Sequence, residues 1–107
     1  MAAPPPGPVA PSPELAARRA ELQKVRESLV MLQARTSSIH TTLDGIRRSQ
    51  AASGLGLRSD WAQAASLMDS FFQGANDALN AGDAAAARDL MEKSERQVEK
   101  LEKALNK

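Results

Sequence analysis

Side chains able to carry out chemistry are few in this sequence. It has one histidine, His40, and no cysteine among its 107 residues. A nucleophilic site needs a nucleophile within hydrogen-bond reach of a base that a third group orients. The acid at helical spacing from His40, Asp44, would form no more than a surface pair with it. Because no thiolate is present for zinc or for a disulfide, these observations favour neither nucleophilic catalysis nor a zinc site.

Two short motifs could hold a nucleotide or a metal ion, and both lack the necessary context. Gly54 and Gly56 precede a predicted helix, but a phosphate-binding loop follows a strand and ends in a lysine, and neither is present. Asp77 and Asp83 have no histidine or calcium-binding loop beside them. We therefore expect no catalytic residue, no metal ligand, no cofactor and no small-molecule substrate, and we interpret the chain as non-enzymatic.

The composition indicates helices. Apolar residues make up 42% of the chain, but only Trp61, Phe71 and Phe72 are aromatic and tyrosine is absent. Aromatic and β-branched residues, which strands favour, are too sparse for a sheet, and a chain of this length can bury one modest core. The sequence has no run of about 18 apolar residues and no secretory signal, so it indicates no compartment.

A heptad repeat over residues 12–52 predicts one unusually long helix with a coiled-coil-like face. Eight of its ten a and d positions, which we call the seam, are aliphatic. The seam consists of Leu15, Leu22, Leu29, Thr36 and Leu43 at a, and Arg18, Val25, Leu32, Ile39 and Ile46 at d. Ser12 can cap this helix, and Gly54 can end it. About 40 residues would span roughly 60 Å, but Gly45 costs about 1 kcal/mol relative to alanine, and a break between Thr36 and Gly45 stays open.

Two shorter helices are predicted to follow, over residues 60–80 and 84–105. Between them, Gly82 can end the first and Asp83 can cap the second. So short a connection makes the two helices an antiparallel hairpin. We therefore predict an all-α fold, an up-down-up three-helix bundle with a long first helix, over residues 12–107.

The hairpin is too short to cover the first helix if that helix is straight. Helices of about 22 residues span roughly 33 Å, against roughly 60 Å for the first helix. We expect an exposed interface on the N-terminal half of the first helix, which pairs with a second copy, docks another protein's helix or folds back at a break. The residues of this expected interface are Leu15, Leu22, Val25, Leu29 and Leu32, with Arg18, Arg19 and Arg26 at its edge.

Charge is unevenly distributed along the chain. Residues 1–58 hold eight Lys/Arg against four Asp/Glu, a balance of +4, and residues 59–107 hold six against nine, a balance of −3. A basic first helix facing an acidic hairpin fits intramolecular complementarity, and a basic surface for an acidic partner is the other interpretation. Nucleic acid or an anionic membrane is less favoured as the partner, because acids interrupt the basic residues and no aromatic side chains accompany them.

Three segments resemble a helical segment found at the C-terminal ends of multidomain bacterial proteins, including some acidobacterial-type serine/threonine kinases. They are Gly54-Leu55-Gly56-Leu57-Arg58-Ser59-Asp60, Ala78-Leu79-Asn80-Ala81-Gly82-Asp83 and Val98-Glu99-Lys100-Leu101-Glu102-Lys103. The resemblance extends over residues 15–107 and implies an accessory domain of a larger bacterial protein. The proline- and alanine-rich residues 1–11 fit a disordered tail or linker. The hairpin also resembles one tetratricopeptide-like unit, although a solenoid needs about three.

The sequence thus leads to a protein-interaction or self-association module whose partner is itself, as a homodimer, or another protein's helix. A binder of nucleic acid or of an anionic membrane through the basic first helix is the alternative. The two hypotheses differ in salt dependence, because contacts with phosphates weaken as the salt concentration rises.

Overall fold

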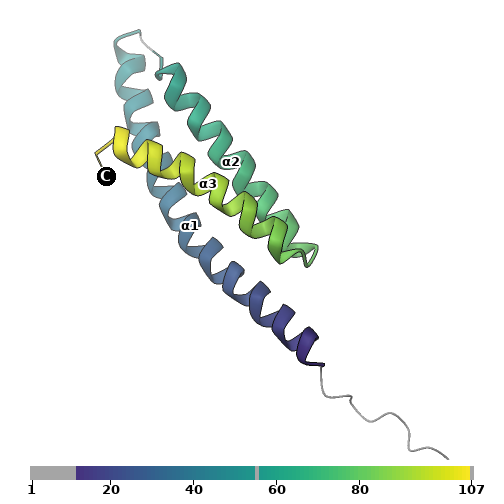
Figure 1. Cartoon of the computed structure of the whole chain (residues 1–107). Coiled ribbons are helices and arrows are strands. Elements are labelled where there is room, and N and C mark those ends of the chain that lie inside the picture. The colour runs from purple at the N-terminus through teal and green to yellow at the C-terminus, as the bar shows by residue number, and fades with distance from the viewer. Residues whose placement is uncertain (1–11, 55, 107) are drawn as a thin grey trace, which may run out of the picture.

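The computed structural model describes residues 12–54 and 56–106, and within them the chain forms three helices and no strand. The helices are α1 (Pro13–Ala52), α2 (Ser59–Asn80) and α3 (Ala84–Ala104). α2 runs back along α1, and α3 then crosses beside both, so their directions are up, down and up (Figure 1). The predicted all-α three-helix bundle with a long first helix is confirmed. The expected tail at residues 1–11 lies outside the described residues.

α1 is a single uninterrupted helix. The Ser12 hydroxyl caps it by accepting a hydrogen bond from the Leu15 amide at 3.2 Å. Pro13 occupies the first turn, where no N–H donor is needed, and Gly54 follows the helix end with a φ of 75°. Gly45 lies within the helix without breaking it. The break that the sequence left open is absent, and α1 is therefore roughly 60 Å long.

The α2–α3 hairpin is closely packed. Gly82 turns the chain with a φ of 79°, and the Asp83 carboxylate caps α3 by accepting from the Ala86 amide at 3.0 Å. A Cβ atom at Gly74, in the second half of α2, would lie 3.1 Å from Cδ1 of Leu90. Glycine at this position thus lets α2 approach α3, and these two helices make the most extensive contact in the bundle.

The core is an aliphatic cluster built on the seam of α1. Its residues from α1 are Val25, Leu29, Leu32, Ile39 and Leu43, and each is 5% exposed or less. The hairpin contributes Ala64, Ala65, Met68, Ala75 and Leu79 from α2, and Ala87, Met91, Val98 and Leu101 from α3. Because four of these nine hairpin residues are alanine, the longer side chains of α1 can fill the space between the helices.

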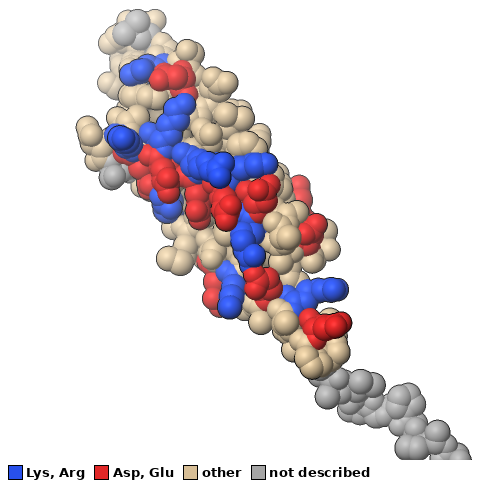
Figure 2. Space-filling model, viewed as in Figure 1, with Lys and Arg blue, Asp and Glu red and all other residues tan. Residues whose placement is uncertain are grey.

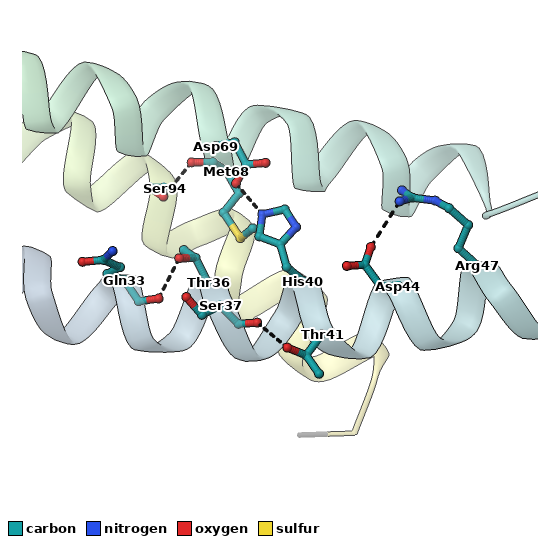
Figure 3. A network of polar contacts seen from close by, with 10 residues as sticks. All are labelled: Gln33, Thr36, Ser37, His40, Thr41, Asp44, Arg47, Met68, Asp69 and Ser94. Atoms are coloured by element: carbon teal, nitrogen blue, oxygen red, sulfur yellow. Dashed lines mark hydrogen bonds and ion pairs between the residues drawn. The ribbon is translucent and has the colours of Figure 1, made fainter.

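Two polar side chains are buried with this cluster, and both have hydrogen-bond partners. The Ser94 hydroxyl donates to the Met68 carbonyl at 2.9 Å, which joins α3 to α2. The Thr36 hydroxyl, at an a position of the seam, donates to the Gln33 carbonyl of its own helix at 2.9 Å (Figure 3). A buried hydroxyl without a partner would be destabilising, so these bonds explain how the core accommodates both residues.

Truncating a seam residue should destabilise the bundle. Ile39 is 0% exposed and Met31, on the same helix, is 72% exposed. Ile39→Ala should lower the free energy of unfolding by about 2–5 kcal/mol, because burial is lost and a cavity remains. Met31→Ala, the control, should change it by no more than about 0.5 kcal/mol. Urea unfolding followed by circular dichroism measures both, and equal losses would show that the core does not lie on the seam.

Candidate interaction surface

Three of the five aliphatic residues of the expected interface lie in the core of the bundle. Val25, Leu29 and Leu32 are 2%, 5% and 2% exposed and belong to the cluster shared with α2 and α3. The expectation that they stay uncovered within the chain is therefore wrong. The hairpin covers more of α1 than the helix lengths suggested, because the turn after α2 lies beside Ala17 and Glu21.

The other two aliphatic residues lie toward the free end of α1. Leu22 is half-buried and packs against the core, whereas Leu15 is 39% exposed. Residues 12–20, which we call the overhang, are all exposed. Figure 1 shows this purple end of α1 extending past the α2–α3 turn. The overhang alone therefore continues the seam beyond the hairpin.

The three arginines expected at the edge of the interface, Arg18, Arg19 and Arg26, are exposed. None of them forms an ion pair with a described residue. Arg18 lines a shallow hollow next to the α2–α3 turn. Arg26 lines a different hollow, of about 340 Å³, between α1 and α2 with Phe72 and Leu79. The structure thus distributes these arginines over separate parts of the surface.

Ion pairs between described residues join α1 to α3 at two places. Arg35 donates to Glu102 through Nη2 at 2.5 Å and through Nε at 3.3 Å, and these hydrogen bonds raise the pKa of Arg35. Nearer the N-terminus of α1, Glu21 pairs with Arg88. In the first pair α1 contributes the base, and in the second it contributes the acid. The charges of α1 and α3 are therefore complementary at individual contacts, and not as a basic helix facing an acidic one. Figure 2 accordingly shows acidic and basic side chains interspersed over α3 and its neighbours.

His40 joins α1 to α2. Its Nε2 lies 2.7 Å from Oδ1 of Asp69, while Asp44 pairs with Arg47 at 3.2 Å (Figure 3). Both side chains of the His40–Asp69 pair are partly exposed, and no group of three or more His, Cys, Asp or Glu able to hold a metal ion occurs among the described residues. The arrangement is therefore that of a bridge between two helices.

The side of α1 that the hairpin leaves uncovered carries a surface that reasoning from the seam missed. Val30 and Met31 are 61% and 72% exposed, more than any other large apolar residue described. We call this surface the outer face, and it consists of Glu27, Val30, Met31, Ala34, Ser37, Ser38, Thr41, Asp44, Gly45 and Arg48. All are exposed, and Asp44 is the one charged residue among those between Glu27 and Arg48. In the sequence, the outer face was indicated only by Val30 and Met31, two adjacent apolar residues that lie outside the a and d positions.

None of the helices, over the residues that the structure describes, has the apolar length that crossing a bilayer requires. Comparisons of the chain with family models, with curated proteins and with solved structures gave no match. The candidate surfaces are therefore defined by their geometry: the overhang, with Leu15, and the outer face.

The Arg35–Glu102 pair should contribute a measurable coupling to stability. The two side chains are 39% and 25% exposed, so we expect about 0.2–1 kcal/mol from a double-mutant cycle of Arg35→Met and Glu102→Gln. High salt should weaken it. Because the pKa of Arg35 is raised, its stabilising charge is lost only in strong alkali, and the coupling should stay constant between about pH 6 and 9. A coupling of zero would mean that the pair does not stabilise the fold.

Proposed function

We propose that this chain is a non-enzymatic protein-interaction or self-association module, and that it is an accessory domain of a larger bacterial protein. The observation that carries the first part is the uncovered side of α1, where Val30 is 61% and Met31 72% exposed. Contiguous apolar surface on a protein in water commonly marks an interaction site. The second part rests on the resemblance of the turn and cap segments and on the proline-rich composition of residues 1–11.

The partner in this proposal is a second copy of the chain or a helix of another protein. A helix face with apolar residues at spacings of three and four residues is suited to packing against another helix. The outer face has this spacing over Val30, Met31 and Ala34, and the overhang adds a second open surface at Leu15, which is 39% exposed. Neither surface requires a cofactor or a small molecule.

A binder of nucleic acid or of an anionic membrane has less support. Arg35 and Arg47 already donate hydrogen bonds to carboxylates of the chain, which reduces the positive charge available to phosphates. The outer face carries two acids, Glu27 and Asp44, and one base, Arg48. Retention on DNA or anionic vesicles that falls with salt, and on neutralising Arg47 and Arg48, would favour this binder instead.

The mass in solution tests self-association. Light scattering should show the 11.4 kDa chain shifting from monomer to dimer between micromolar and millimolar concentrations, because the uncovered apolar surface is small. Leu15→Glu tests the overhang, Met31→Glu tests the outer face, and Ser66→Glu, at an exposed position of α2, is the control. A chain that stays monomeric throughout would rule out self-association and leave docking of another protein's helix.

A further inference from the structure

Gly45 has no packing role inside the chain. Gly54 and Gly82 have positive φ angles that favour glycine. A Cβ atom at Gly74 would press on Leu90. At Gly45, inside α1, an added Cβ atom meets nothing within 4 Å, and glycine disfavours a helix relative to alanine. The sequence thus weakens α1 at an open position of the outer face, as expected if a group from outside the chain packs there.

The outer face is suited to the close approach of a second helix. Apart from Asp44 at its margin, its middle consists of the small residues Ala34, Ser37, Ser38, Thr41 and Gly45. The Thr41 hydroxyl donates to the Ser37 carbonyl at 3.1 Å (Figure 3), so its donor is already satisfied within α1. Small side chains at a contact allow short distances between helix axes.

We propose that the outer face binds the outer face of a second copy of this chain, with the two α1 helices antiparallel about a twofold axis between Ser37 and Ser38. The inference rests on the proposed function and names its surface and its partner. Residues equally far from the axis then lie opposite each other. A single surface that pairs with itself gives a closed dimer, the commonest form of assembly.

The positions of Val30 and Gly45 set the register. In this arrangement Val30 of each copy lies opposite Gly45 of the other, so the exposed valine fills the open space above the glycine. Ala34 lies opposite Thr41, between these contacts and the axis. A shift of one heptad in either direction would place Val30 opposite Ser38 or Ala52 and separate it from Gly45. The antiparallel register thus accounts for exposed Val30 and for Gly45, and it places Met31 opposite Asp44, which already pairs with Arg47 of its own helix.

Charge favours the same direction and the same register. Glu27 and Arg48 bound the outer face, and neither forms an ion pair with a described residue. Glu27 accepts a hydrogen bond from the Gln23 amide group at 3.3 Å, and Arg48 donates to the Asp44 carbonyl at 3.3 Å. The antiparallel register places Glu27 of each copy opposite Arg48 of the other. Parallel helices would bring like charges together, which is unfavourable.

Cysteine cross-linking tests this arrangement directly, because the chain has no cysteine of its own. Ser37→Cys lies next to the axis, so two copies should form a disulfide, which requires Cα atoms within about 7 Å. Val30→Cys alone should not cross-link, because its two copies would be about 22 Å apart along the helices. A mixture of Val30→Cys and Gly45→Cys should cross-link. Mild oxidation followed by non-reducing electrophoresis gives the readout.

Gly45→Ala should separate folding from association. Alanine favours the helix, so the folding equilibrium constant of the dilute monomer should rise about fivefold. The added methyl group occupies the space for Val30, so the dissociation constant of the dimer should rise as well, and Gly45→Leu should abolish the dimer. Ser28→Leu, at an exposed position of α1 outside the outer face, is the matched control and should leave the dimer unchanged. Thermal unfolding and light scattering measure the two effects.

Three results would overturn the inference. A dimer in which Val30→Cys cross-links to itself would be parallel, or antiparallel about an axis near Val30, and either arrangement contradicts the proposed register. A dimer that survives Gly45→Leu but dissociates with Leu15→Glu would pair through the overhang, and the proposed function would then stand without the outer face. A chain that is monomeric up to millimolar concentration would exclude the second copy as partner.

Discussion

The fold depends on the burial of one stripe of α1, its seam, by a hairpin whose core residues are alanines interspersed with Met, Leu and Val. Ile39 and Leu43 are almost fully buried, and they share one core cluster with hairpin residues such as Ala64 and Met68. The close contact of α2 with α3 at Gly74 makes the hairpin a single compact surface. Because apolar burial is roughly proportional to area and has no direction, the seam alone holds the helices together without specifying their register.

Polar contacts at the margins of the core supply that register. Arg35 reaches Glu102 near the C-terminus of α3, Glu21 pairs with Arg88 near its N-terminus, and His40 reaches Asp69 on α2. Each contact is partly exposed, and such pairs contribute little to stability on average. These pairs nevertheless specify one arrangement. If α3 slid along α1, or if α2 and α3 exchanged places, the charged side chains would lose their partners, which is unfavourable. The Ser94 bond to Met68 has the same effect between α2 and α3.

The fold followed from the sequence because its signals are local: the Ser12 and Asp83 caps, the Gly82 turn and the spacing of the seam. The candidate site did not, because a heptad repeat identifies an apolar stripe and leaves open what covers it. Leu29 and Leu32 have the pattern of an intermolecular interface, yet the chain's own hairpin buries them. The His40–Asp69 bridge joins residues 29 positions apart, a separation at which the sequence carries no periodic signal. Val30 and Met31 stood out only as apolar residues away from the seam.

The separation of the seam from the outer face determines how assembly and folding are related. An interface built from Leu29 and Leu32 would compete with the bundle's own core, so binding would require the hairpin to move. An interface on the outer face would leave the core intact. The folding equilibrium and the association equilibrium would then be independent, except at residues that affect both. Gly45 is such a residue, because its missing side chain weakens the helix and leaves space above it. In the proposed dimer, the 40-residue α1 would use its seam for folding and its outer face for assembly, and neither role would require a conformational change.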